Sequence, residues 1–306
     1  MSYFGAVEGT GFEFVEAEFG ACLVGHARVE RLWTGARWCE GPAWFGGGRY
    51  LVFSDVPNNR MLRYDDCDGR VAVFREPSNH ANGNTVDREG RLVTCEHLTR
   101  RVTRTEHDGS IIVLADRFDG KRFNSPNDVA VKSDGSIWFT DPDYGIDYDY
   151  EGARAEGEIG ARNVYRIDPA TGAAAIAADD FDHPNGLAFS PDERVLYVAD
   201  SGFSEGAERP RHIRRFDVDA KGKLGKSEVF ATCAAGLFDG FRIDRDGRVW
   251  TSTGEGIDCY RADGRLIGRV RIPEIVANLA FGGRARNRLF ICGTTSLYSL
   301  YLKING

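Results

Sequence analysis

An oxygen-bearing polar residue recurs at the start of a repeated sequence pattern, and this recurrence is the strongest chemical signal in the chain. The six residues at this position are Glu40, Asn82, Asn127, Asn185, Asp239 and Asn278. Two carboxylates and four carboxamides suit a hard divalent cation, since calcium accepts about 6–8 oxygen ligands of this kind and magnesium and manganese accept similar donors. Zinc favours histidine or cysteine, which the set lacks. Asn and Asp also cap strand entrances by bonding backbone amides, but six in one frame favour a metal site.

Each polar residue opens a predicted β-hairpin. In the clearest copy, residues 127–145 read NDVAVKSDGSIWFTDPDYG, in which Val129 and Val131 alternate as strand residues and Asp134–Gly135 forms the turn. Similar copies begin at residues 82, 185 and 239, and weaker ones, with glycine-rich or GGRARNR turns, begin at residues 40 and 278. Successive copies start between 39 and 58 residues apart, a spacing that fits one four-stranded sheet per copy.

This repeat predicts an all-β fold, a six-bladed β-propeller with an axial metal site, as one domain over residues 26–306. A large β-sandwich would not require a polar residue at the same place each time. Residues 27–35 (ARVERLWTG) are predicted to add an outer strand to the last blade and close the ring. Residues 1–25 form an amino-terminal arm whose aromatic residues are expected to pack on the propeller or on a neighbouring molecule; they are Phe4, Phe12, Phe14 and Phe19.

Because the innermost strand of each blade lines the central channel, the polar residues are predicted to ring the axis. The returning strand of each hairpin ends at the same face, which predicts a second set of residues around the mouth: Asp55, Glu96–His97, Asp141, Asp200 and Gly254–Glu255. His97 is a candidate base beside the metal, or alternatively a histidine that bonds backbone carbonyls. Two long insertions, residues 142–162 and 201–211, are expected to wall the pocket.

The composition of the chain limits which binding partners and which cellular compartment we expect. Acidic residues outnumber basic ones by 46 to 39, and no Lys/Arg block marks one face or tail, so nucleic acid is not an expected partner. No apolar run approaches the ~18 residues of a membrane-spanning helix, and the acidic amino terminus is unlike a secretory signal. The seven cysteines are scattered without a C-x-x-C pair, which indicates reduced thiols. These features predict a cytoplasmic protein with no membrane partner. The closed propeller suits a monomer, and its edge strands or the amino-terminal arm suit a homodimer.

The motifs CEGPAW, NGNTVD, SPNDVAV, DGSIWFTDP, HPNGLAFSPDE and DGFRID together resemble the sugar lactonases related to gluconolactonase and regucalcin (senescence marker protein). Diisopropylfluorophosphatase is a more distant six-bladed cousin. The resemblance runs from about Glu40 to the carboxyl terminus. It implies metal ligands at Glu40, Asn185 and Asp239, with Asn127 as a further ligand or a substrate contact, and Asp239 as proton donor or acceptor. Regucalcin-like members carry a substrate-binding arginine where this chain has Ser125, so the sugar preference does not transfer.

The predicted function is metal-dependent hydrolysis of a sugar lactone to the aldonic acid. A divalent ion, calcium first and otherwise Mg, Mn, Zn or Fe, would polarise the carbonyl while Asp239 handles the proton. No G-x-S-x-G nucleophile elbow is present. The predicted contacts to the sugar are Asn82, His97, Arg122, Asn124, Asn127 and Asp141. The alternatives are a hydrolase of non-sugar lactones or organophosphates, and a non-enzymatic metal-binding interaction propeller.

Overall fold

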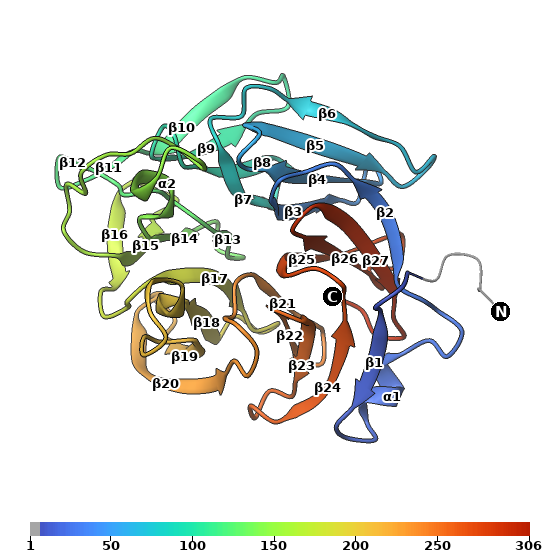
Figure 1. Ribbon diagram of the computed structural model, residues 1–306. Coiled ribbons are helices and arrows are strands. Elements are labelled where there is room, and N and C mark those ends of the chain that lie inside the picture. The colour runs from blue at the N-terminus through green and yellow to red at the C-terminus, as the bar shows by residue number, and fades with distance from the viewer. Residues whose placement is uncertain (1–6) are drawn as a thin grey trace.

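The structure is a computed structural model in which residues 7–306 are described, and their strands form six antiparallel blades around a common axis (Figure 1). The first four blades use consecutive strands: β3 (Cys39–Phe45), β4 (Tyr50–Asp55), β5 (Arg60–Asp65) and β6 (Val71–Arg75); β7 (Ala81–Val86), β8 (Leu92–Glu96), β9 (Arg101–Thr105) and β10 (Ile111–Ala115); β13 (Val129–Val131), β14 (Ile137–Asp141), β15 (Asn163–Ile167) and β16 (Ala174–Ala178); β17 (Pro184–Phe189), β18 (Val195–Asp200), β19 (His212–Val218) and β20 (Leu224–Thr232).

The fifth blade contains β21 (Phe241–Ile243), β22 (Val249–Thr253), β23 (Gly256–Tyr260) and β24 (Leu266–Arg271), and the sixth contains β25 (Val276–Gly282), β26 (Arg288–Gly293) and β27 (Ser296–Tyr301). A small ribbon of β11 (Arg117–Phe118) and β12 (Lys121–Arg122) links the second and third blades. The helical pieces are short: α1 (Phe19–Cys22), α2 (Tyr144–Asp147) and a 3-10 turn (Gly202–Glu205). None of the helices in residues 7–306 has the length and hydrophobicity needed to cross a bilayer. The predicted six-bladed propeller is confirmed.

An amino-terminal strand closes the ring, as the sequence predicted. Strand β2 (Glu30–Thr34) pairs antiparallel with β27 and so becomes the outer strand of the sixth blade, with Glu30 opposite Ser299 and Thr34 opposite Ser296. The first and last parts of the described chain therefore share one sheet. Opening the ring would expose the unpaired edge of β27.

The segment before β2 lies against the fifth blade. Strand β1 (Gly11–Phe14) pairs with β24 at the outer edge of that blade (Figure 1). Phe19 is fully buried in one hydrophobic cluster with Trp250, and Phe12 packs against the same cluster. Phe14 is largely exposed but touches the Phe19 ring edge-on. Phe4 lies outside the described residues.

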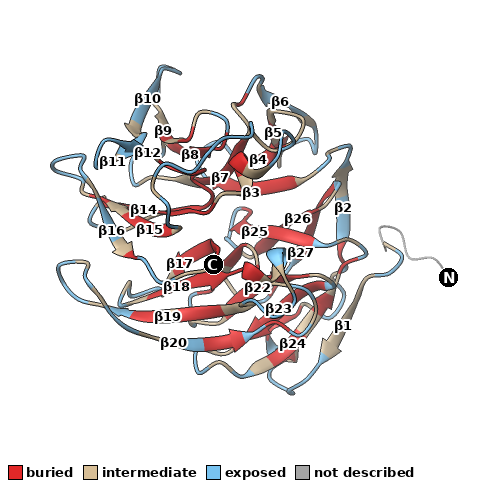
Figure 2. Ribbon diagram, turned by 60° about the vertical axis from the view of Figure 1, so that its left-hand side comes forward, coloured by how far each residue is buried: buried red, intermediate tan, exposed pale blue. Residues whose placement is uncertain are grey.

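Burial decreases from the axis outwards. Inner and middle strands are almost entirely buried, whereas outer strands such as β6 and β10 are exposed (Figure 2). Apolar side chains from neighbouring blades interlock between the sheets, which is how sheets in a propeller bury their faces. All seven cysteines are free; six are buried and Cys67 is exposed.

The inner strands approach one another so closely at the axis that they require glycine. A Cβ atom on Gly186 would lie 2.2 Å from the backbone oxygen of Asp239, and one on Gly83 would lie 2.4 Å from the backbone oxygen of Asn127. Real Cβ contacts are never this short, so any larger residue would push two blades apart. The glycine that follows most of the polar ring residues is therefore a packing requirement.

We predict that Gly186→Ala destabilises the fold by at least about 1–3 kcal/mol, because the methyl group overpacks the contact with the fifth blade. Thermal unfolding measures the effect. The matched control is Gly47→Ala, since a Cβ at Gly47 meets nothing within 4 Å. Equal melting temperatures for the two variants would contradict this account of the axis.

Candidate active site at the propeller axis

A cavity of about 470 Å³ opens at the end of the axis where the inner strands begin. Its floor contains five of the six polar residues that the sequence singled out, and apolar side chains form much of its wall. The floor residues are Glu40, Asn82, Asn127, Asn185 and Asp239; the wall includes Trp38, Tyr144, Phe203, Leu237, Ile275 and Val276. Glu40 and Asp239, which are 199 positions apart in the sequence, thus lie at one cavity floor.

Irregularities in the inner strands turn these side chains toward the axis. The pairing register shifts between Glu40 and Ala43 in β3, and between Pro184 and Leu187 in β17. The second blade has the same shift beside its floor residue. A β-bulge re-aims side chains that regular pleating would send into the space between blades. In the third and fifth blades the floor residue instead precedes the regular strand.

The sixth polar residue does not belong to the floor, which corrects the predicted ring. Asn278 occupies the position of the following residue in other blades: its Oδ1 accepts a hydrogen bond from Leu279 N–H, as Asp128 Oδ1 accepts one from Val129 N–H. The position equivalent to the floor is Ala277, whose oxygen accepts the Gly240 N–H. This copy of the repeat lacks an Asp-Gly turn, so the sequence did not show that Asn278 is one residue beyond the floor position. Its side chain lies in the layer beneath the floor.

Hydrogen bonds between floor side chains fix how their oxygens are presented. Asn82 Nδ2 donates to Asn127 Oδ1 at 2.5 Å, and Asn127 Nδ2 donates to Asn185 Oδ1 at 2.7 Å. From the layer beneath, Asn278 Nδ2 donates to Glu40 Oε2 at 3.0 Å. Each carbonyl oxygen has two lone pairs, so Asn185 Oδ1 keeps one for a ligand, whereas Asn127 Oδ1 also lies 3.2 Å from His97 Nε2. Glu40, Asn82, Asn127 and Asn185 are at most 6% exposed, whereas Asp239 is only partly buried and is the most accessible of the five.

Two carboxylates share this floor without a basic partner in it. Burial and the nearby Asp128 raise the pKa of Glu40 to about 8, and burial and Glu40 raise the pKa of Asp239 well above its usual value. Burying two like charges together is costly unless a cation neutralises them. Residues 7–306 hold no cluster of three or more His, Cys, Asp and Glu side chains suited to a metal. A cation at this floor would therefore depend on carboxamide oxygens as well, and the donors present fit a hard divalent ion.

The two insertions wall the cavity, as predicted from their length. Residues 142–162 contribute Tyr144 and Glu151, and residues 201–211 contribute Phe203 and Ser204. Glu151 is a further carboxyl group that sequence reasoning missed, and burial raises its pKa to about 7. Its signal was weak, because it is one of several acids in a tyrosine-rich loop.

Tyr144 is held by a buried histidine that the sequence analysis also did not assign. The Tyr144 ring stacks on His183 with centroids 5.5 Å apart. His183 is fully buried, with Nε2 3.2 Å from Asp143 Oδ1 and Nδ1 2.6 Å from Asp182 Oδ1. These two carboxylates raise its pKa despite burial. Tyr144, Asp143 and His183 belong to the motifs DPDYG and HPNG, and Asp182 directly precedes the second motif. Their contacts join the third and fourth blades at the rim.

Four of the six predicted substrate contacts do not line the axial cavity, and three of them hold one segment of the chain. Arg122 donates through Nη2 to the Thr99 oxygen. Asn124 donates to the backbone oxygens of Asp141 and Ala161. Asp141 is fully buried, where it accepts the Asn124 N–H, and burial raises its pKa to about 8. All three are occupied in holding the segment that leads into the third blade, so we do not retain them as substrate contacts.

His97 lies behind the floor rather than in the cavity. It is 1% exposed, with Nε2 3.2 Å from Asn127 Oδ1 and Nδ1 3.2 Å from the Glu151 oxygen. Burial lowers its pKa to about 4, so the ring is neutral near pH 7 and donates to only one of these oxygens at a time. This arrangement matches the alternative structural role stated for His97 and not that of a base facing substrate.

The predicted second set of mouth residues serves the fold instead. Asp55 accepts the Arg37 N–H and Asp200 accepts the His183 N–H, in each case from the segment just before a floor residue. Glu96 is likewise buried and bonded to Arg101. Of this set only Gly254 lines the cavity. The acids at the ends of the second strands thus anchor the segments that lead into the inner strands. Their spacing from the floor residues in the sequence did not reveal this structural role.

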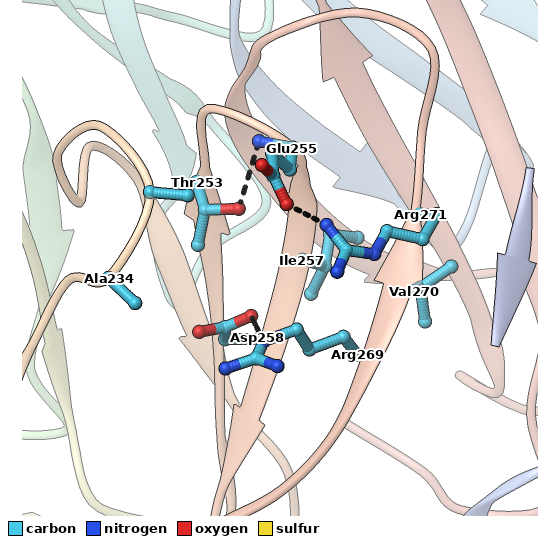
Figure 3. Close-up of a pocket in the computed structure, with 9 residues that line it drawn as sticks. Ala234, Thr253, Glu255, Ile257, Asp258, Arg269, Val270 and Arg271 are labelled. Carbon is cyan, nitrogen blue, oxygen red and sulfur yellow. Dashed lines mark hydrogen bonds and ion pairs between the residues drawn. The ribbon is translucent and has the colours of Figure 1, made fainter. Parts of the chain in front are cut away.

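A second cavity, of about 220 Å³, lies beside the fifth blade but has internally paired charges (Figure 3). Arg269 bonds Asp258 at 3.1 Å, and Arg271 pairs with Glu255. Glu13 of β1 also binds both arginines. Since these groups satisfy one another, the axial cavity is the better candidate for chemistry.

The fold and the cavity define a six-bladed propeller with an oxygen-lined floor at one end of its axis. The family described as SMP-30/Gluconolactonase/LRE-like region matches residues 38–295. The chain belongs to this family, and the resemblance inferred from its motifs is confirmed.

Individual relatives cover nearly the whole chain. A gluconolactonase from Zymomonas mobilis is 30% identical over 305 residues, covering 91% of this chain and 82% of that protein. A pentonolactonase from Haloferax volcanii is 29% identical, covering 84% of this chain and 82% of that protein. The solved structure of a gluconolactonase from Xanthomonas campestris is 40% identical, with a TM-score of 0.89 and coverage of 96% of this chain and 95% of that chain.

We predict that the His97 imidazole stays neutral from pH 8 down to about pH 5, because its pKa is lowered to about 4. In the unfolded chain a histidine titrates near pH 6.5, so the unfolded state gains a proton first and stability falls as the pH drops below about 6.5. Nitrogen-15 NMR of the ring, assigned with His97→Gln, checks the charge state. An imidazolium signal for His97 at pH 6 would contradict the prediction.

Proposed function

We propose that this protein hydrolyses lactones at the floor of the axial cavity. The observation that carries the proposal is the pair of carboxylates, Glu40 and Asp239, gathered with three carboxamides beneath a cavity of about 470 Å³. Relatives in the same family that cover most of the chain are named for the hydrolysis of glucono- and pentonolactones. A lactone is a cyclic ester, and its hydrolysis requires a polarised carbonyl, an activated water and a proton for the leaving oxygen.

The floor residues that would hold a divalent ion are Glu40, Asn185 and Asp239, with Asn127 as a fourth ligand or a substrate contact. When bound, such an ion supplies Lewis-acid polarisation of the lactone carbonyl. The all-oxygen donor set favours calcium, and it also accommodates magnesium or manganese, with zinc or iron as less typical occupants. The hydrogen bonds from Asn82 and Asn278 keep Asn127 and Glu40 in fixed orientations, so little rearrangement accompanies binding.

Asp239 is the proposed acid and base because it is the most accessible carboxylate of the floor. One carboxylate oxygen takes a proton from the water that adds to the carbonyl carbon. The ring C–O bond then breaks, and Asp239 returns the proton to the departing ring oxygen, which leaves a hydroxy acid. Its backbone N–H donates to Ser252 Oγ at 2.9 Å, which holds the residue in place for both transfers.

The substrate we propose is a sugar lactone, bound between a polar floor and largely apolar walls. Asn82 and Asn127 line the cavity and remain candidate contacts for its hydroxyl groups. Glu151 faces the same space from the 142–162 insertion and adds a further acceptor. The seven free cysteines support a reducing, cytoplasmic compartment, where the protein would act as a monomer or homodimer.

One observation favours a second candidate within the same chemistry. Trp38, Phe203, Leu237 and Ile275 give the cavity apolar walls that suit non-sugar lactones or organophosphate esters. A panel of sugar lactones, aliphatic lactones and phosphotriesters ranks these substrates. A folded protein that binds metal but turns over none of them would favour the non-enzymatic interaction propeller.

We predict that Asp239→Asn lowers lactonase turnover by at least about 100-fold, since the variant keeps the shape of the side chain but cannot take up the proton. The assay is hydrolysis of D-glucono-1,5-lactone and of pentonolactones, followed with a pH indicator above the uncatalysed rate. Asp246→Asn is the matched control, because this acid of the same blade lies in an exposed turn and pairs with Arg248. Similar rates for the two variants would remove Asp239 from the mechanism.

We also predict that divalent cations bind more tightly as the pH rises. Glu40 has a pKa of about 8 without a cation, so binding below pH 8 displaces its proton, and this proton alone lowers affinity by up to about tenfold per pH unit. Calorimetric titration of chelator-treated protein with calcium, magnesium and manganese at pH 6, 7 and 8 measures this. Glu40→Gln should weaken binding and reduce its pH dependence. Tight binding that is unaffected by the substitution and by pH would place the ion elsewhere.

A further inference from the structure

A second axial cavity, of about 180 Å³, lies at the opposite end of the inner strands from the candidate active site. Its lining comes from positions further along the same strands, including Trp44 of β3, Asn84 of β7, Arg242 of β21 and Phe281 of β25. Arg286, in the turn between β25 and β26, completes one side. The propeller axis therefore has a cavity at each end.

A layer of buried residues separates the two cavities. It contains the glycines that let the inner strands approach, together with Asp128 and Asn278, which are 2% and 1% exposed. Arg242 reaches this layer from below, with Nη1 3.9 Å from Asp128 Oδ2. The same nitrogen donates to the Phe241 oxygen at 2.7 Å. Arg242 therefore has one distant carboxylate and one backbone oxygen for its five N–H groups.

Arginines gather around this lower cavity, and among the described residues Asp128 is the one carboxylate paired with a lining arginine. Burial, then Arg245 and then Arg242 lower the pKa of Arg286, so the three guanidinium groups act on one another as like charges. Within residues 7–306 neither Arg245 nor Arg286 has a carboxylate within ion-pair distance. Arg248, in the same turn as Arg245, differs because it pairs with both Asp244 and Asp246. Among the described residues, Arg245 and Arg286 therefore lack the carboxylate partners that Arg248 has.

A buried donor accompanies the arginines. Trp44 is 6% exposed and lines the lower cavity, and its indole Nε1–H has no hydrogen-bond partner among the described residues. Buried donors are seldom left unpaired in folded proteins, because an unmade hydrogen bond costs about 1–3 kcal/mol. Trp44, a lining residue, thus carries an unused N–H whose nitrogen is itself buried, and the positive charge at the cavity comes from Arg242 and Arg286.

We propose that the lower axial cavity is a binding site for a small free oxyanion of the phosphate, sulfate or carboxylate type, held by Arg242 and Arg286. Guanidinium groups bind such anions through paired, charge-assisted hydrogen bonds. A volume of about 180 Å³ admits one anion of this size with a few waters, since a water occupies about 30 Å³ in the liquid. The site is distinct from the lactone cavity and does not depend on the proposed hydrolysis.

Inorganic phosphate is the probe for the test, and the measurements are thermal stability and calorimetric affinity. Phosphate also binds divalent ions, so the titrations are run with and without a chelator, and only binding that persists with the chelator is assigned to the lower cavity. The variants are Arg242→Gln and Arg286→Gln. Arg284→Gln is the matched control, because it removes an equal charge from the same exposed turn as Arg286 but does not line the cavity.

The expected result is saturable phosphate binding by the wild type and by Arg284→Gln, with a melting temperature that rises with phosphate concentration. Arg242→Gln and Arg286→Gln should bind at least tenfold more weakly. If Arg242→Gln does not fold, Arg286→Gln alone decides, since Arg286 lies in the turn between β25 and β26 and not in a strand. No saturable binding by the wild type up to 10 mM phosphate, or equal loss in all three variants, would overturn the proposal.

Discussion

The whole structure depends on how closely six inner strands can approach one axis. Contacts such as Gly186 against the Asp239 backbone leave no space for a side chain, so the layer beneath the floor is mostly glycine. The residues one position earlier must then point along the axis into the cavity, and they are the oxygen donors. Closing the ring and assembling the candidate site are consequently the same event, which is why residues far apart in sequence meet with fixed hydrogen bonds between them.

Local signals made the architecture predictable from the sequence. Alternating apolar residues and Asp-Gly turns mark each hairpin, so blade number and the closing strand β2 followed from pattern alone. The floor was predicted for the same reason, except where the turn signal was weak. In the sixth blade the GGRARNR turn lacks the Asp-Gly pair that aligns the other hairpins. The sequence analysis therefore assigned Asn278 to the floor position, which Ala277 occupies. A shift of one residue is enough to move a side chain from the cavity to the layer beneath it.

What the sequence could not supply was the direction in which polar side chains bond. Asp55, Asp141 and Asp200 end their strands at the correct face, but each turns inward to accept a backbone N–H from the segment entering the blade. Conversely, Tyr144 and Glu151 reach the cavity from an insertion that has no repeat to place it. Both outcomes depend on contacts between distant segments. Unlike the hairpins, these contacts do not repeat at a regular spacing, so the sequence pattern does not predict them.

Asp128 adds a third acid to the two that line the floor of the axial cavity. Four other blades place glycine at this position, so a carboxylate here is an exception that the packing does not require. It is 2% exposed, and burial raises its pKa. Positive charge offsets part of the cost of burying a carboxylate, and Arg242 provides it from below at 3.9 Å. Above it stand Glu40 and Asp239, whose pKa values Asp128 raises further. Three acids along one axis with a single arginine therefore raise one another's pKa values, which favours the protonated forms of Glu40 and Asp239 as long as no cation lies among the floor oxygens.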